Sequence, residues 1–399
     1  MKRRLPCSFT ALVLFAGLLP AQSNQAVTPE RAAVSFADNG QKLGTGDSWY
    51  VQLGDLNGDG RLEAYFDGAV WLNDGHGNFT QSDQSFGPPN RPAYFADLNG
   101  DGLVDVVCDD VVYLNDGRFH FSEKRRLPTD MAMVSAHLAD LNGDGAIDLV
   151  VAGATADRIL LNDGKGNFTN TGKSLGGWAQ CTYAVGDING DCIPDIYVAI
   201  PHTPPPNMLP AKDKIWLGNG RGSFTEGTPT IQVGEHRGIV LADLDGDGSA
   251  DLLIGDARGA RVYFNDGNGG FTDSGQRLGR GGVVAGDFDG DGSLDAFFYD
   301  GKPTDNGKPN TVWLNDGKGH FTDSGLRLGN ANSVAAAVGD LNGDGKPDVF
   351  VANVKNVVTK AGAGFDEVWL NTTGARAQPA ATAQVGPDSP PPRGSAHTK

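Results

Sequence analysis

The sequence contains little that would suit a membrane span or a nucleic-acid partner. Beyond its first two dozen residues it has no apolar run long enough to cross a bilayer. Basic residues are few: 32 Lys and Arg stand against 49 Asp and Glu, which gives a net charge of −17. Such a negative chain is a poor partner for nucleic acid or for an anionic membrane surface, so we expect neither.

Cysteine is also scarce, with four residues in 399. Cys7 falls in the N-terminal segment. The remaining Cys108, Cys181 and Cys192 are an odd number with a spacing that fits neither a disulfide framework nor a zinc site. At most one bridge can form among them. A Cys181–Cys192 bridge across a hairpin and two free thiols are both open alternatives.

The N-terminus has the pattern of an export signal. Basic residues at positions 2–4 precede an apolar stretch over residues 11–19, Pro20 closes that stretch, and small and polar residues follow. The apolar core is short for a membrane anchor, so the pattern predicts a cleaved signal peptide over residues 1–23. We therefore expect a secreted, periplasmic or cell-surface protein without a transmembrane span in its mature form.

Glycine, in contrast, is abundant, with 58 residues, and much of it belongs to one unit that occurs seven times. The unit opens with an acidic loop, and its copies read DLNGDGRLE from Asp55, DLNGDGLVD from Asp97, DLNGDGAID from Asp140, DINGDCIPD from Asp187, DLDGDGSAD from Asp243, DFDGDGSLD from Asp287 and DLNGDGKPD from Asp340. Two apolar, strand-like runs follow each loop. In five copies the second run ends in Asn-Asp-Gly, a hairpin-turn signal, and a Phe-bearing strand comes next.

The spacing between successive loops is 42 to 56 residues, which is room for four short strands but not for a helical repeat. Four strands per unit predict an all-β, seven-bladed β-propeller. The seventh unit stops after its third strand, while SFADNGQKLG from Ser35 matches the Phe-bearing strands FTDSGQRLG and FTDSGLRLG. We therefore expect the N-terminal segment to supply the outer strand of the last blade, which leaves no open sheet edge.

These repeats place the propeller over residues 32–371, and we expect it to be a monomer. Residues 372–399 change in composition to Ala, Pro, Gln and Ser and end in PDSPPPRGSAHTK. Such a segment has no core-forming residues and is predicted to be a disordered tail.

Each acidic loop has the residues that a calcium ion requires. In the pattern D-x-[DN]-G-D-[GC]-x-x-[DE], positions 1, 3, 5 and 9 offer side-chain oxygens and position 7 offers its carbonyl oxygen. Calcium takes six to eight oxygen ligands with flexible geometry. Position 4 is always glycine, which is expected at a positive φ, and position 2 is always apolar, which is expected in the core. An EF-hand is excluded because the acid falls at position 9 and the flanks are strands.

The alternative is that the loops are plain turns, since Asp and Asn readily cap their own backbone. Against this, 23 of the 49 acidic residues lie in these loops, three or four to a loop, and would repel one another without a cation. The sequence therefore predicts up to seven Ca²⁺ ions. The candidate ligands are Asp55, Asn57, Asp59, Arg61, Glu63, Asp97, Asn99, Asp101, Leu103, Asp105, Asp140, Asn142, Asp144, Ala146, Asp148, Asp187, Asn189, Asp191, Ile193, Asp195, Asp243, Asp245, Asp247, Ser249, Asp251, Asp287, Asp289, Asp291, Ser293, Asp295, Asp340, Asn342, Asp344, Lys346 and Asp348.

Two loops depart from the pattern. Glu63 replaces Asp at position 9 of the first loop, where we expect a looser site. Cys192 replaces Gly at position 6 of the fourth loop, where a Cβ is expected to be strained.

With these motifs the chain resembles the FG-GAP or VCBS-type repeat proteins, which are related to the propeller of integrin alpha chains. The match covers residues 33–371 and rests on the seven acidic loops and on six of seven third strands that run into an [ND]-G turn followed by Phe. The resemblance implies calcium in the loops between first and second strands. It also implies cell-surface adhesion or ligand recognition, with an extracellular protein or a glycan as the partner.

Some fungal lectins share a similar seven-bladed repeat and bind sugars between blades. This chain departs from them because no Gly-Trp-Arg element recurs in every blade. In such a propeller the acidic loops and the Asn-Asp-Gly turns share one face. Three long insertions follow second strands, over residues 201–213, 301–310 and 353–365, and so are expected on the opposite face. Loops on a rigid scaffold are the usual place for recognition.

The candidate ligand-binding residues lie on that opposite face, at the entries to the inner strands. They are Trp49, Arg91, Trp178, His236, Arg237, Arg280 and Asn332. No Ser-His-Asp or metalloprotease signature appears, so binding is favoured over catalysis. The sequence thus predicts an exported, calcium-binding recognition or adhesion module. A lectin-like propeller is the alternative. A propeller hydrolase or lyase is a third possibility, which a His-Arg-acid cluster at the mouth of the central channel would favour.

Overall fold

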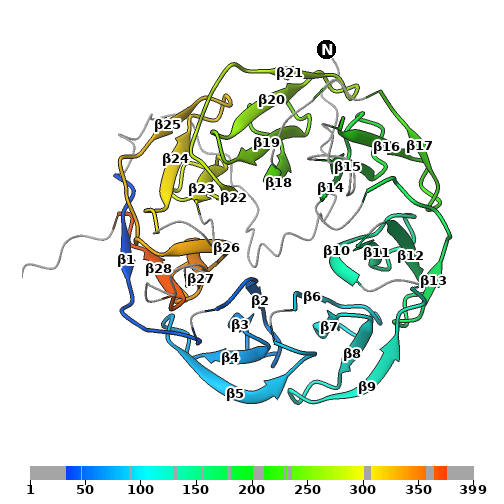
Figure 1. The fold of residues 1–399 in the computed structure, drawn as a ribbon, viewed down its shortest axis with the longest axis horizontal. Coiled ribbons are helices and arrows are strands. Elements are labelled where there is room, and N and C mark those ends of the chain that lie inside the picture. Colours follow the sequence, from blue (N-terminus) through cyan, green and yellow to red (C-terminus); the bar gives the residue numbers. More distant parts are fainter. Residues whose placement is uncertain are drawn as a thin grey trace, which may run out of the picture.

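The computed structural model describes residues 33–374 except 46, 90, 130–132, 155, 178–180, 201–210, 229–230, 232–235, 301–306 and 356–363. In this part of the chain the fold consists of 28 strands in seven four-stranded antiparallel sheets, which surround a central axis (Figure 1). The predicted all-β, seven-bladed propeller is confirmed. No helix among the described residues has the length and apolar character needed to cross a bilayer. The predicted signal peptide lies outside the described residues, as does the tail beyond Gly374.

In blades 1 to 6 the four strands follow one another along the chain, from the inner strand at the axis to the outer strand at the rim (Figure 1). Blades 1 to 3 contain β2 (Gln52–Gly54), β3 (Glu63–Phe66), β4 (Ala69–Asn73), β5 (Phe79–Ser85); β6 (Ala93–Ala96), β7 (Asp105–Cys108), β8 (Val111–Asn115), β9 (Phe121–Arg126); and β10 (Met133–Ala139), β11 (Asp148–Gly153), β12 (Asp157–Asn162), β13 (Phe168–Asn170). Blades 4 to 6 contain β14 (Thr182–Gly186), β15 (Asp195–Ala199), β16 (Lys214–Gly218), β17 (Phe224–Glu226); β18 (His236–Ala242), β19 (Asp251–Asp256), β20 (Arg261–Asn265), β21 (Phe271–Asp273); and β22 (Gly282–Gly286), β23 (Asp295–Tyr299), β24 (Thr311–Asn315), β25 (Phe321–Asp323).

Blade 7 is assembled from both ends of the chain. It contains β26 (Asn332–Gly339), β27 (Asp348–Val354), β28 (Glu367–Asn371) and, as its outer strand, β1 (Phe36–Asp38). In β1, Phe36 pairs with Asn371 and Asp38 with Trp369. The Phe36 ring also packs edge-on against Phe288 of blade 6, with 5.5 Å between ring centroids. The predicted closure of the ring by the N-terminal segment is therefore confirmed.

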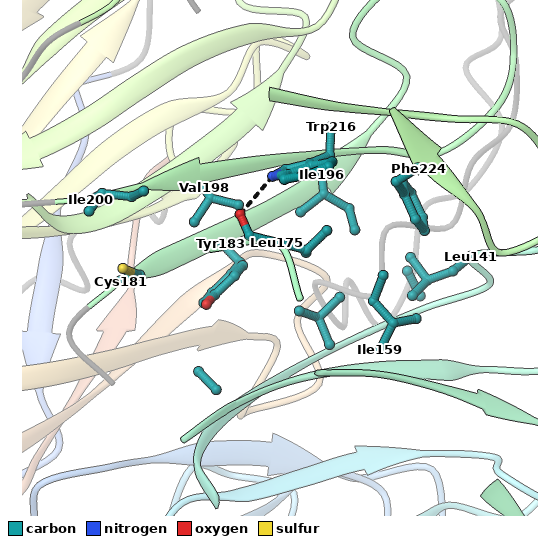
Figure 2. Close-up of a cluster of buried hydrophobic side chains, with 13 residues drawn as sticks. Leu141, Ile159, Leu175, Cys181, Tyr183, Ile196, Val198, Ile200, Trp216 and Phe224 are labelled. Atoms are coloured by element: carbon teal, nitrogen blue, oxygen red, sulfur yellow. Dashed lines mark hydrogen bonds between the residues drawn. The ribbon is translucent and has the colours of Figure 1, made fainter. Parts of the chain in front are cut away.

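The hydrophobic core is divided among the junctions between blades. Within the described residues there are seven clusters, and each joins second and third strands of two neighbouring blades. Figure 2 shows the cluster between blades 3 and 4, where the Trp216 indole N–H donates to the carbonyl of Leu175 at 2.9 Å. Leu141, the apolar position 2 of the third acidic loop, lies in this cluster and is fully buried. Burial of one such leucine contributes about 1.5–3 kcal/mol.

The same arrangement holds at position 2 of every acidic loop. These seven side chains are at most 2% exposed, as expected from the sequence; they are Leu56, Leu98, Leu141, Ile188, Leu244, Phe288 and Leu341. Position 4 also behaves as predicted, because each of its glycines has a φ between 75° and 81°. The acidic loops are thus anchored in the interblade core on one side and open to solvent on the other.

The two cysteines of blade 4 lie at opposite ends of β14. Cys181 is buried just before the strand begins, whereas Cys192 is exposed in the loop that follows the strand. A strand advances about 3.3 Å per residue, and a disulfide requires Cα atoms within about 7 Å. The Cys181–Cys192 bridge that the sequence left open is therefore excluded.

Deletion of residues 24–46 should remove β1 and leave β28 as an exposed edge that pairs with other molecules. We expect this variant to aggregate and to melt at a lower temperature, as measured by size-exclusion chromatography with light scattering and by thermal unfolding. Deletion of residues 24–31 alone, which retains β1, is the control. A monomeric 24–46 deletion that melts like the control would contradict the role of β1.

Candidate functional site

Each acidic loop is a compact turn held by its own carboxylates. In the loop of blade 3, Asp140 Oδ1 accepts the backbone N–H of Gly143 at 2.7 Å, and Asp140 Oδ2 accepts that of Gly145 at 2.9 Å. Asn142 Oδ1 accepts the N–H of Asp144 at 2.9 Å. The first Asp and the two glycines make equivalent contacts in six of the loops, so the chain curls around position 1. The side-chain oxygens of positions 3 and 5 remain at the exposed mouth of the turn.

The acid at position 9 joins the loop to the rest of its blade. Asp148 Oδ2 accepts the N–H of Leu141 at 2.9 Å, and Oδ1 accepts the N–H of Asn162 at the end of the third strand, at 2.7 Å. Asp148 is fully buried. Burial raises its pKa to about 7, and the nearby carboxylates of Asp144 and Asp140 add to the rise. A nearby cation would therefore favour the ionised form of this buried acid.

The asparagine that ends the third strand connects neighbouring blades. Asn162 is 3% exposed, and its side-chain N–H groups donate to Ile147 O in its own loop and to Leu98 O in the loop of blade 2, at 3.0 and 2.8 Å. The equivalent bond to the preceding blade occurs at six of the seven junctions, with donor–acceptor distances of 2.8–2.9 Å. The donor–acceptor pairs are Asn73–Leu341, Asn115–Leu56, Asn162–Leu98, Asn265–Ile188, Asn315–Leu244 and Asn371–Phe288.

Blade 4 is the exception, because Gly218 stands where the other blades have asparagine. A Cβ at Gly218 would lie 2.2 Å from the carbonyl oxygen of Pro194, so no side chain fits there without a shift of the backbone. Sequence reasoning assigned these asparagines only to hairpin turns. The signal for their second role was present, since asparagine keeps this place in six of seven units, including Asn371, where no Asn-Asp-Gly turn follows.

The donor sets of two loops are suited to a cation as they stand. In the loop of blade 5, carboxylate oxygens of Asp243, Asp245 and Asp247 lie within 4.8 Å of one another. In the loop of blade 6 the same holds for Asp287, Asp289 and Asp295. Two oxygens on opposite sides of a calcium ion, each about 2.3–2.6 Å from the ion, are about 4.8 Å apart. These residues therefore fit a calcium ion, and blades 5 and 6 are also the two with four acids in the loop.

Loops 1 and 7 differ from the other five acidic loops because a basic side chain stands at position 7. The guanidinium of Arg61 is hydrogen-bonded to Asp59, and Lys346 Nζ lies 3.5 Å from Asp344 Oδ2. Glu63 also departs from the other position 9 acids: its Oε1 accepts the Asn57 side chain at 3.2 Å. In loop 4, Cys192 takes a φ of 68°, so a side chain occupies a conformation that favours glycine. The donor sets are thus unequal from loop to loop.

The candidate ligand-binding residues on the opposite face divide into two groups. Trp49 and Arg280 are exposed, Arg91 lies 3.4 Å from Asp109, and Arg237 is half-buried on β18. Asn332 is buried, and so is His236. These two are removed from the candidate surface because their side chains are enclosed by the ends of blades 7 and 5. Trp178 lies outside the described residues.

His236 belongs to a buried polar cluster at the end of blade 4. Its Nε2 lies 3.1 Å from Asp213 Oδ1, and the Tyr197 hydroxyl donates to Asp213 Oδ2 at 2.6 Å. Both members of the His236–Asp213 pair have side chains with 0% exposure. The pair is closed to solvent in the structure.

Comparison with known proteins agrees with this architecture. Five overlapping segments, over residues 109–151, 140–198, 187–254, 243–298 and 299–351, match the FG-GAP-like repeat. The chain belongs to the FG-GAP-like repeat family. This FG-GAP propeller matches none of the curated protein sequences.

Solved structures similar to the FG-GAP propeller share its fold. One is an Agrocybe aegerita lectin described as recognising non-reducing terminal N-acetylglucosamine, with 22% identity, a TM-score of 0.52, and coverage of 69% of this chain and 79% of the lectin. Another is BBS1N in complex with ARL6DN, with 13% identity, a TM-score of 0.54, and coverage of 85% of this chain and 97% of that one.

Replacement of Asn162 by Ala should leave the carbonyls of Leu98 and Ile147 buried without their donors. The expected loss is about 1–3 kcal/mol of the free energy of unfolding, measured by denaturant titration. Asn78→Ala is the control, because the Asn78 side chain donates to Asp74 within the exposed part of the equivalent hairpin of blade 1. Equal effects of the two substitutions would contradict the interblade role of Asn162.

Proposed function

We propose that this protein is an exported, calcium-stabilised recognition module that binds its ligand on the face opposite the acidic loops. The observation that carries the proposal is the exposure of three aromatic residues on neighbouring segments at that face, Trp49, Tyr50 and Phe365, which we call the aromatic patch. Among the described residues these are the large hydrophobic side chains that remain exposed, at 38%, 38% and 36%. Exposed aromatics gathered at one place on a soluble surface mark interaction sites, whereas scattered ones do not.

Hydrogen bonds join the chain segments that bear the patch. The hydroxyl of Ser48, next to Trp49, donates to Asp366 Oδ2 at 2.7 Å. Asp366, next to Phe365, accepts the N–H of Asn353 with its other oxygen, also at 2.7 Å. Both segments precede strands, β2 and β28, that run towards the acidic loops, which places the patch on the far face. An ordered aromatic surface loses little conformational entropy on binding, which favours recognition.

We propose that the acidic loops bind calcium because their donor sets, described above, suit this ion. The strongest support comes from loops 5 and 6, where three carboxylates converge within 4.8 Å. In blade 3, Asp140, Asp144, Asp148 and Asn142 would supply the side-chain oxygens and Ala146 the carbonyl. A calcium ion there would supply positive charge between carboxylates that otherwise repel one another. Its effect on this chain would be to hold the ends of the first two strands and, through Asn162, the preceding blade.

Removal of calcium should destabilise the whole ring. With a dissociation constant near 10⁻⁴ M and calcium near 10⁻³ M, each site contributes about 1.4 kcal/mol, and seven contribute about 10 kcal/mol. We therefore expect excess EGTA to lower the melting temperature by many degrees. Calcium, but not magnesium, should restore it, because magnesium requires stricter octahedral geometry. A melting curve that EGTA leaves unchanged would contradict the calcium proposal.

The recognition proposal is tested by a screen of the calcium-loaded protein against a glycan array and a panel of extracellular proteins. For any ligand found, Trp49→Ala and Phe365→Ala should weaken binding by about 2 kcal/mol each, as for aromatic residues at binding hot spots, with the melting temperature unchanged. His320→Ala, on an exposed hairpin of the acidic-loop face, is the control and should have no effect.

A glycan ligand is the second candidate, and the similarity in fold to the Agrocybe aegerita lectin favours including terminal N-acetylglucosamine in the array. Binding that survives Trp49→Ala and Phe365→Ala would contradict the patch as the recognition surface. If a sugar binds and its binding is lost when residues between blades are substituted, the lectin-like function replaces the aromatic-patch proposal.

A further inference from the structure

On the face opposite the acidic loops, one buried residue of blade 5 gathers three arginines. Asp256, at the end of β19, is 3% exposed. Its Oδ1 accepts the backbone N–H of Arg258 at 2.6 Å, and its carbonyl accepts the N–H of Gly281, the residue after Arg280, at 3.0 Å. On β18, Arg237 is the extra residue of a bulge that lies opposite the end of β19. The three arginines therefore emerge from neighbouring segments, and we call them the arginine cluster.

The segments that bear the arginine cluster pack backbone against backbone. A Cβ built on Gly255 would lie 2.5 Å from the carbonyl oxygen of Gly281, so only glycine allows this approach. Arg237 lies on β18 and Gly281 directly precedes β22, and these are the neighbouring inner strands of blades 5 and 6 (Figure 1). Burial raises the pKa of Tyr299 in blade 6 to about 12, and the charge of Arg237 opposes that rise. The cluster therefore spans the junction between blades 5 and 6.

The positive charge of this cluster faces solvent. Arg258 and Arg280 are exposed, and neither forms an ion pair with another residue that the structure describes. Two acids stand at the same junction, Asp256 and Asp300, but both are buried, and Asp300 is paired with Lys308 Nζ at 3.0 Å. Two exposed guanidinium groups therefore remain available to a ligand.

This charge is particular to blade 5. The turn between the second and third strands contains Asp67 in blade 1 and Asp109 and Asp110 in blade 2, whereas blade 5 has Arg258. The six residues of β19 separate the cluster from the acidic loop of the same blade by about 17 Å, at about 3.3 Å per residue. That is about twice the Debye length of about 8 Å at physiological ionic strength. An anion at the cluster is therefore attracted by the arginines although the whole chain is negative.

We propose that the arginine cluster binds the acidic sugars of an extracellular glycan through their carboxylate or sulfate groups. The inference rests on the proposed function in one respect, recognition on the face opposite the acidic loops. A planar guanidinium binds such oxyanions through two parallel N–H bonds. A glycan is favoured over an acidic peptide because Trp49 and Tyr50 are exposed before β2, another inner strand, at the same end of the central axis. Their flat rings suit the apolar faces of sugar rings.

The test uses the full mature chain, loaded with calcium, and two acidic probes, the hexasaccharides of hyaluronan and of chondroitin sulfate. The first carries carboxylates alone, and the second also carries sulfates. The uncharged methyl ester of the hyaluronan probe and the peptide hexaglutamate are the comparison ligands. Calorimetry should show that at least one acidic hexasaccharide binds, that sodium chloride weakens its binding, and that the methyl ester does not bind. Binding of the sulfated probe alone would identify sulfate as the recognised group.

Arg258→Gln and Arg280→Gln should each weaken this binding about tenfold or more, as expected for the loss of a charge-assisted hydrogen bond, with the melting temperature unchanged. Arg277→Gln is the matched control. It removes the same charge from the outer rim of blade 5, where Arg277 is paired with Asp273 at 3.1 Å, and it should have no effect on binding.

The outcomes separate this inference from the aromatic patch. The arginine-cluster proposal is overturned if neither acidic hexasaccharide binds, if hexaglutamate binds more tightly than both, or if the two arginine variants bind as the unmodified chain does. If Trp49→Ala and Phe365→Ala weaken glycan binding while the arginine variants do not, the aromatic patch stands and the cluster proposal is wrong. If the arginine variants alone weaken binding, the cluster stands and the aromatic patch is not the recognition surface.

Discussion

The fold depends on one hydrogen-bond network that recurs around the ring, centred on the acid at position 9 of each acidic loop. In blade 3 the two oxygens of Asp148 hold the start of the loop and the end of the third strand, through Leu141 and Asn162. Asn162 then reaches the loop of the preceding blade. Six of the seven units are thereby tied to the preceding unit close to the point where their own strands converge. A propeller whose sheets pack against one another largely through apolar side chains gains a buried, directional contact that fixes the register between blades.

This network also explains why the acidity of the chain is compatible with a compact fold. Buried acids such as Asp148 lie close to further carboxylates, and burial raises the pKa of Asp148 to about 7. A bare loop of this kind is electrostatically unfavourable near neutral pH, whereas a divalent cation would offset the repulsion. Loops 1 and 7 offset part of it with Arg61 and Lys346. We therefore propose that the acidic-loop face maintains the ring and that the aromatic patch on the opposite face serves recognition.

Much of this architecture could be predicted from the sequence because the unit repeats. Seven copies with matching loop glycines predicted the blades, and the similarity of SFADNGQKLG to the later FTDSG strands predicted the pairing of β1 with β28. The interblade bond of Asn162 could not be foreseen, since a side chain that reaches another blade has no local signature. The burial of His236 and Asn332 was missed for a related reason: both stand at strand entries, but packing of neighbouring segments encloses them.

The central claim, that the acidic loops are cation sites that hold the blades together, is tested most directly by counting bound calcium. Native mass spectrometry of the mature chain, titrated with calcium after complete removal of metal, gives the number of ions and their order of binding. We predict saturation at up to seven ions, with two binding first, because loops 5 and 6 each contribute four acids and have no basic residue at position 7. A chain that remains folded and binds no calcium across the titration would contradict the account.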